Sequence, residues 1–128
     1  MAIPLLLLSH HAHRQVSEWA SDRTLHLSGH AAIESYSVLT RLPGDARLQP
    51  ADAVTLLDAT FGDPLVLSGA AAREAHRELA LRGVAGGASY DALVALAARA
   101  HDVVLATRDA RALPTYQALG VQAELIAE

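Results

Sequence analysis

The sequence contains no cysteine, which excludes a disulfide framework, a zinc–thiolate site and a cysteine nucleophile. It also contains no lysine, so every basic side chain apart from histidine is an arginine. Aromatic residues make up 4% of a chain that is 52% hydrophobic, and the core is therefore expected to consist of Leu, Val, Ile and Ala. The net charge is −4 without a basic run, which argues against tight, sequence-independent binding of nucleic acid but is compatible with a nuclease that has an acidic metal site.

Long apolar segments are also lacking. The opening MAIPLLLLS is too short for a membrane span, and no positive charge precedes it as in a signal peptide, so the cytoplasm is the expected location. We found no internal repeat, linker or low-complexity segment. The 128 residues therefore predict a single domain spanning 1–128.

Residues 88–109, ASYDALVALAARAHDVVLATRD, predict a helix, a tight loop and a strand. Ser89 can cap the helix, whose apolar residues recur at helical spacing until it ends near Ala100–His101. Residues 103–106 form a short β-branched run, typical of a strand buried on both faces in a parallel sheet. Asp91 falls in the first turn of this helix and Asp109 just past the strand, at the sheet edge where ligands bind in α/β folds.

The rest of the chain shows the same alternation of helical and extended patterns. Expected helices cover 2–8, 10–20, 30–42, 51–60, 69–82 and 110–119, and expected strands cover 24–27, 64–67, 103–106 and 121–126. Strands separated by helices imply parallel pairing and right-handed crossovers. The predicted class is α/β, a three-layer sandwich with a parallel sheet flanked by helices on both faces.

Three acidic residues are the candidates for chemistry: Asp91, Asp109 and Glu34, which lies within the third helical pattern. Clustered carboxylates favour Mg²⁺ or Mn²⁺, and a bound metal can lower the pKa of a water and hold phosphate oxygens. Each acid also has an ordinary interpretation. Asp91 can interact with the helix dipole, Asp109 can cap the following helix, and Glu34 can be an exposed helix residue.

Other polar residues give weaker signals. His10, His11 and His13 include an i, i+3 pair, but no HExxH motif or second cluster at ligand spacing supports a metal site there. The remaining histidines look like surface or core residues. The arginines near the candidate acids, Arg41, Arg108 and Arg111, can contact phosphate or can simply maintain solubility.

Two stretches together resemble a known family. AAIESYSVLTRLPG at 31–44 and ASYDALVALAARAHDVVLATRDARALPTYQALGV at 88–121 are similar to the PIN-domain ribonucleases, specifically the VapC toxins of bacterial type II toxin–antitoxin pairs. The resemblance implies an acidic pocket that binds Mg²⁺ or Mn²⁺ and hydrolyses RNA, leaving 5′-phosphate and 3′-hydroxyl ends. It assigns Glu34, Asp91 and Asp109 to the second, third and fourth acidic positions, and Thr107 to a polar helper position. It also implies a VapB-type antitoxin as partner and a homodimer.

The amino terminus departs from the family pattern. Family members begin with a strand that ends in an acidic ligand, whereas this sequence starts at MAIPLLL, so we expect the first strand and first acid to be missing. The leading interpretation is a metal-dependent endoribonuclease. The alternative is a truncated, non-catalytic PIN-like module that retains the antitoxin-binding and dimer surfaces. A Rossmann-like small-molecule binder is a third class, but no glycine fingerprint follows any predicted strand.

Overall fold

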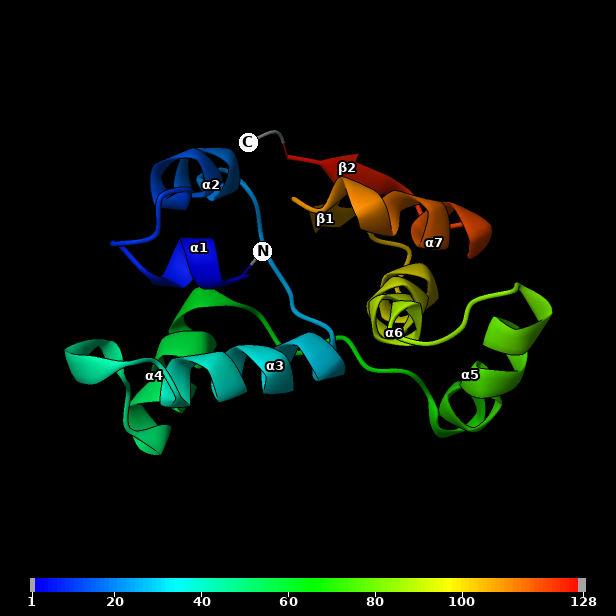
Figure 1. Cartoon of the computed structure of the whole chain (residues 1–128), viewed down its shortest axis with the longest axis horizontal. Helices are drawn as coiled ribbons and strands as arrows, with labels where there is room; N and C mark the ends of the chain where they lie inside the picture. Colours follow the sequence, from blue (N-terminus) through cyan, green and yellow to red (C-terminus); the bar gives the residue numbers. More distant parts are fainter. Residues whose placement is uncertain (1, 127–128) are drawn as a thin grey trace. The chain divides into compact units, whose positions relative to one another are not determined.

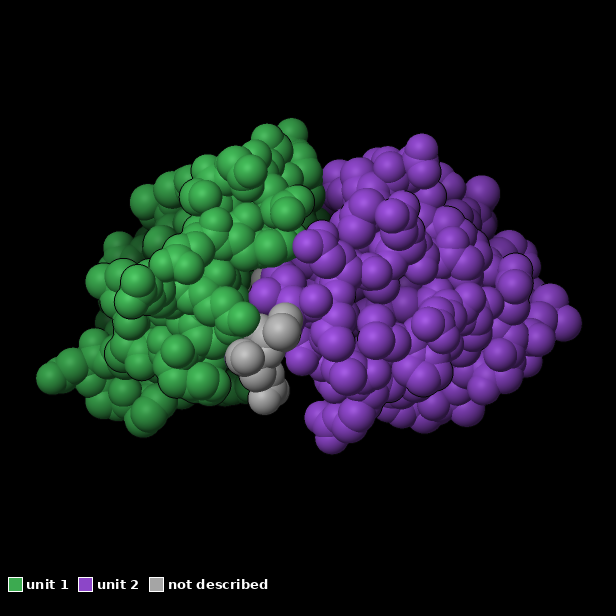
Figure 2. Space-filling model, turned by 90° about the horizontal axis from the view of Figure 1, so that it is seen from above, with its two compact units in different colours: residues 1–64 green, residues 65–128 purple. Residues whose placement is uncertain are grey.

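The computed structural model describes residues 2–126 and divides the chain into two compact units. The first unit is Met1–Pro64 and the second is Leu65–Glu128 (Figure 2). None of the helices within the described residues is long and apolar enough to cross a membrane.

The first unit is built from helices. In chain order they are α1 (Ala2–Leu6), α2 (His13–Ala20), α3 (Gly29–Thr40), the short 3₁₀ helix η1 (Gly44–Ala46) and α4 (Pro50–Thr60) (Figure 1). Helix α1 packs against α2, and α3 packs against α4. The side chains that bury most completely here are Val16, Leu39 and Ala53, with exposed fractions of 1%, 0% and 0%.

Local signals explain where the two longer helices of this unit begin. The Ser28 side chain accepts a hydrogen bond from the backbone N–H of Ala31 at 3.0 Å, which satisfies a donor that the first turn of α3 would leave unpaired. Pro50 occupies the first turn of α4, where its missing N–H costs nothing.

The second unit combines helices with a parallel pair of strands. Its elements are α5 (Gly69–Leu81), α6 (Ala88–Ala100), β1 (Leu105–Thr107), the 3₁₀ helix η2 (Ala110–Ala112), α7 (Leu113–Ala118) and β2 (Ala123–Leu125). Strands β1 and β2 lie side by side in Figure 1, with Leu105 opposite Ala123 and Thr107 opposite Leu125. Helices with parallel strands confirm the predicted α/β class. The core of this unit consists of Leu79, Ala92, Ala95, Leu96, Ala98, Leu105, Ala112, Tyr116, Leu119 and Val121.

The turn between α6 and β1 is a Schellman motif, a standard way of ending a helix. The N–H of Val103 bonds to the carbonyl of Ala98 at 3.0 Å, and the N–H of Asp102 bonds to the carbonyl of Arg99 at 3.2 Å. Asp102 adopts a left-handed φ of 53°, in the position where glycine is usual. The helix thus stops at His101, its C-cap, and the chain reverses within three residues.

This turn shortens the strand that the sequence predicted at 103–106. Since Val103 and Val104 belong to the exit from α6, they remain 42% and 50% exposed, and the ladder begins only at Leu105. The prediction of a strand buried on both faces is therefore wrong for its first half. The predicted Ser89 cap is also wrong, because α6 begins at Ala88 with Gly87 as its N-cap.

Two further predicted strands, at 24–27 and 64–67, are wrong as well. Neither segment forms a strand, although Leu65 is an isolated bridge residue: the carbonyl of Leu25 accepts from the N–H of Gly62 at 2.9 Å, and the carbonyl of Val66 bonds to the His101 ring at 2.9 Å. Alternating apolar residues favour extended backbone, but a strand also requires a partner with free groups in register. These segments are extended connections instead.

Candidate functional site

Asp109 lies directly beyond the carboxyl end of β1, as the sequence predicts. Its backbone N–H donates to the hydroxyl of Thr107 at 3.0 Å, and Thr107 is itself only 7% exposed. The Asp109 carboxylate accepts two hydrogen bonds from Arg111, one from the backbone N–H at 3.0 Å and one from Nε at 3.2 Å. Asp109 thus caps η2, which confirms its ordinary interpretation without removing its carboxylate from the strand end.

The environment of Asp109 favours its charged form. The side-chain hydrogen bond from Arg111 is the main reason that the pKa of Asp109 lies below its ordinary value, and the backbone N–H of Arg111 adds to the effect. The side chain is 48% exposed. An ionised, solvent-facing carboxylate is an acceptor available to a cation or to a water proton.

Asp91 lies in the first turn of α6, where the positive end of the helix dipole favours its carboxylate. The residue is half-buried, and its neighbour Ala92 is fully buried in the core. Because alanines line the buried side of α6, the helix packs closely and carries Asp91 on a rigid element. Asp91 and Asp109 both belong to the second unit.

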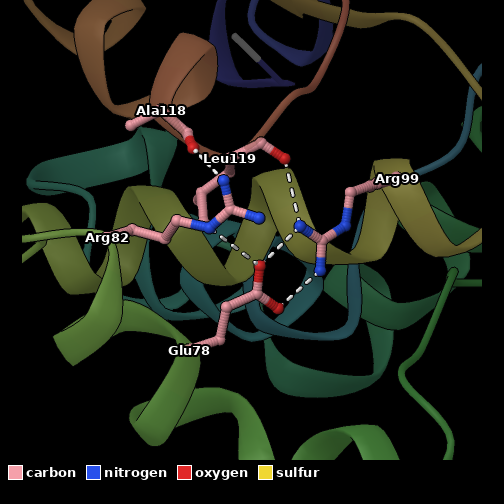
Figure 3. A network of polar contacts seen from close by, with 5 residues as sticks. All are labelled: Glu78, Arg82, Arg99, Ala118 and Leu119. Carbon is pink, nitrogen blue, oxygen red and sulfur yellow. Dashed lines mark hydrogen bonds and ion pairs between the residues drawn. The ribbon is translucent and has the colours of Figure 1, made fainter.

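A polar network fixes the orientation of α6 (Figure 3). Glu78 on α5 forms two contacts of 2.6 Å with the guanidinium of Arg99 near the end of α6. Arg99 also donates to the carbonyl of Leu119 at 3.0 Å, and Arg82 donates to the carbonyl of Ala118 at 3.3 Å. The bond from Arg99 lowers the pKa of Glu78, and the same bond raises the pKa of Arg99. The side chains of Glu78, Arg82 and Arg99 thus connect α5, α6, α7 and the loop before β2.

Glu34 lies on α3 in the first unit. Its carboxylate is 2.8 Å from Nε2 of His30, one turn earlier on the same helix, and its side chain is 61% exposed. The neighbouring Ser35 and Leu39 face the core, with exposed fractions of 5% and 0%. The buried residues fix the rotation of α3, and Glu34 lies on its exposed side.

The three carboxylates have the oxygen chemistry that Mg²⁺ and Mn²⁺ prefer. Within residues 2–126, no three His, Asp or Glu side chains are gathered closely enough to form a complete metal cage. Magnesium sites in enzymes that act on phosphates often use one or two carboxylates together with water and substrate oxygens. Asp109 and Asp91 therefore fit such a metal by the nature of their donor atoms.

Four contacts were not predicted from the sequence, two of them made by these acids and two by the amino-terminal histidines. His30 was treated as a surface or core residue, although its i, i+4 spacing to Glu34 places the two side chains on one face of α3, within 2.8 Å of each other. For Arg111 the sequence left two roles open, phosphate binding and solubility, whereas in the structure its side chain binds Asp109. In the amino-terminal histidine group, the His13 ring bonds to the carbonyl of Pro4 at 2.8 Å, and the His10 ring accepts from the N–H of Ala12 at 3.1 Å.

Comparisons with known proteins agree on one family. The PIN domain model matches residues 2–117. Ribonuclease VapC27 of Mycobacterium tuberculosis is 54% identical over 121 residues, which cover 94% of this chain and 88% of that protein. Ribonuclease VapC40 of the same species is 44% identical over 117 residues, covering 91% of this chain and 87% of the relative. No solved structure gives a significant match.

Proposed function

Since the chain belongs to the VapC family of PIN-domain proteins, we propose that it is a metal-dependent endoribonuclease that hydrolyses phosphodiester bonds in RNA. The observation that carries this proposal is the 54% identity, over 94% of the chain, to a protein named as a ribonuclease. The acidic residues discussed above support it, because the carboxylates suit a divalent cation and the chain has no cysteine nucleophile.

In the proposed site, Asp91 and Glu34 would hold Mg²⁺ or Mn²⁺ directly or through water, and Asp109 would complete the pocket or orient the attacking water. When bound, the metal supplies a water of lowered pKa and charge stabilisation for the phosphate oxygens. Asp109 is suited to orient a water by accepting a hydrogen bond from it, because its lowered pKa keeps the carboxylate ionised and the carboxylate faces solvent. Thr107 holds the backbone of Asp109 and so acts as a positioning residue.

The proposal extends to partners and location. As the toxin of a VapBC-type pair, the protein binds a cognate VapB-type antitoxin, which inserts a segment into the acidic groove and so controls the nuclease. It forms a homodimer and acts in the cytoplasm on RNA. Family membership supports these statements.

The first experiment is cleavage of a structured RNA in the presence of Mn²⁺ by the wild-type chain and by Asp91→Asn. We expect the wild type to cut the RNA and the variant to lose this activity, because an amide is a poorer ligand for a hard cation than a carboxylate. Asp58→Asn, at an exposed position on α4, is the matched control and should cleave like the wild type.

The opposite result favours the alternative function. If the folded wild type and the Asp91→Asn variant both leave RNA intact, the chain is a non-catalytic module that keeps binding surfaces only. This alternative is tested because no three-residue metal cage is found within residues 2–126. Circular dichroism of both proteins establishes that they are folded before cleavage is compared.

A further inference from the structure

Arg108 occupies an unusual position between two residues of the site. It follows the buried Thr107 at the end of β1 and precedes Asp109. The residue is half-buried, and its Nε is inaccessible to solvent. Within residues 2–126, this Nε is the one buried side-chain nitrogen or oxygen without a hydrogen-bond partner.

An unsatisfied guanidinium nitrogen is costly for the free protein. Guanidinium groups remain charged at all relevant pH values, so the group cannot avoid the cost by losing its proton. The adjacent carboxylate of Asp109 does not accept from this Nε, and its Oδ1 accepts from Arg111. Buried polar groups in folded proteins nearly always have a partner, so an exception needs a physical explanation, and a bound anion is one that suits a guanidinium group.

We propose that Arg108 is a phosphate-binding residue that contacts a backbone phosphate of the RNA beside the one that is cut. This inference rests on the proposed function, which supplies a polyanionic substrate at the end of β1. When the strand of RNA arrives, the side chain turns, and its guanidinium donates to phosphate oxygens in the forked geometry that suits them. Arg108 therefore contributes to binding the substrate, whereas Asp91 and Asp109 contribute to its hydrolysis.

Binding without cleavage tests this assignment. A short, fluorescently labelled single-stranded RNA is titrated with protein in EDTA, and anisotropy is followed at several salt concentrations. We expect Arg108→Gln to weaken binding about tenfold and to reduce the slope of log K against log[salt] by about 0.7, the value for one phosphate contact on a single strand. Arg73→Gln, which changes an exposed arginine on α5, should leave both quantities at the wild-type value.

Thermal stability separates this role from a structural one. Arg108→Met removes the unsatisfied Nε while keeping most of the side-chain volume, so we expect the melting temperature to rise and RNA binding to weaken. An arginine with a structural partner would give a fall in melting temperature instead, and that result would overturn the proposal. Equal affinity and equal salt slope for wild type and Arg108→Gln would overturn it too.

Mn²⁺-dependent cleavage, measured in parallel, distinguishes failure of this inference from failure of the proposed function. A wild type that binds RNA through Arg108 but never cuts it contradicts the ribonuclease and supports the phosphate site. A wild type that cuts RNA, with Arg108→Gln equal to it in affinity, KM and salt slope, supports the ribonuclease and contradicts the phosphate site. If the contact is made, KM should rise about tenfold for Arg108→Gln with little change in kcat.

Discussion

The ion pair between Glu78 and Arg99 provides the sharpest test of how the second unit is held together. Substituting Glu78→Gln keeps the size of the side chain but removes the negative charge of the carboxylate. The oxygens of this carboxylate lie 2.6 Å from the two terminal nitrogens of the Arg99 guanidinium. Arg82, whose Nε lies 3.7 Å from the same carboxylate, would also lose its charged partner. We expect the variant to unfold at a lower temperature than the wild type.

The size of the effect follows from the exposure of the pair. The side chains of Glu78 and Arg99 are 28% and 37% exposed, so the pair lies between a surface ion pair of about 0.2–1 kcal/mol and a buried one whose disruption costs about 3–5 kcal/mol. After allowance for solvent screening, we expect a loss of about 1–2 kcal/mol. An unfolding entropy of roughly 2.1 cal/mol/K for each of 128 residues converts this loss into a fall of about 4–7 °C in Tm.

The assay is thermal unfolding of four proteins followed by circular dichroism: wild type, Glu78→Gln, Arg99→Gln and the double variant. The double-variant cycle should give a coupling energy of about 1 kcal/mol between the two positions. Glu74→Gln is the control, because Glu74 pairs with Arg77 on the exposed side of the same helix, where both side chains are more than two-thirds exposed. A Glu78→Gln variant that melts within error of Glu74→Gln would refute the reasoning.

The pH dependence gives an independent check with a definite sign. Folding lowers the pKa of Glu78 from its ordinary value of 4.5, so the folded state binds this proton less tightly than the unfolded state. The stabilisation is therefore fully present above the unfolded pKa and is lost as the pH falls through the lowered folded pKa. The difference in Tm between wild type and Glu78→Gln should be constant near neutral pH and should shrink on acidification below 4.5. A difference that persists in strong acid would contradict an ionic origin.

Two further predictions concern the turn after α6 and the capped acid. Asp102→Gly should stabilise the protein by about 0.5–1 kcal/mol, because glycine adopts the left-handed φ of 53° without strain. The midpoint of urea unfolding should therefore rise, and an unchanged or lower midpoint would contradict the turn assignment. Arg111→Gln should raise the pKa of Asp109 toward its ordinary value by removing the guanidinium hydrogen bond. The carboxyl ¹³C chemical shift of Asp109 measures this in an NMR titration, and an unmoved midpoint would show that Arg111 does not control the charge.

The helices could be predicted closely from the sequence because their signals are local. Pro50 and the helical spacing after it fix the start of α4, and the observed Pro50–Thr60 differs from the predicted 51–60 by one residue. Asp109 was placed correctly at a strand end for the same reason, since it follows directly on the apolar run of β1. Within such segments, spacing and capping residues carry most of the information.

The strands could not be predicted as well, because a ladder depends on residues far away in the chain. The segment at 24–27 has the alternation of a strand, yet the carbonyl of Leu25 bonds to Gly62 and the His26 ring to the carbonyl of Asp63. The network of Glu78 and Arg99 joins positions 21 residues apart and leaves no pattern that a sequence alone would show. The unsatisfied Nε of Arg108 is likewise a property of packing, although the sequence does mark this arginine as a neighbour of Asp109.

The Schellman turn at the end of α6 also limits how the length of the chain can change there. Inserting or deleting one residue between His101 and Leu105 would shift the strand by one position and turn Leu105 and Thr107 to the opposite face of the sheet. Asp109 would turn with them, while Asp91 would stay in place on the helix. Exchange of side chains at this junction is tolerable, but a change in its length would alter how Asp109 is presented at the end of β1. The exposed glycine loop at 85–87, by contrast, can absorb an added residue without moving either acid.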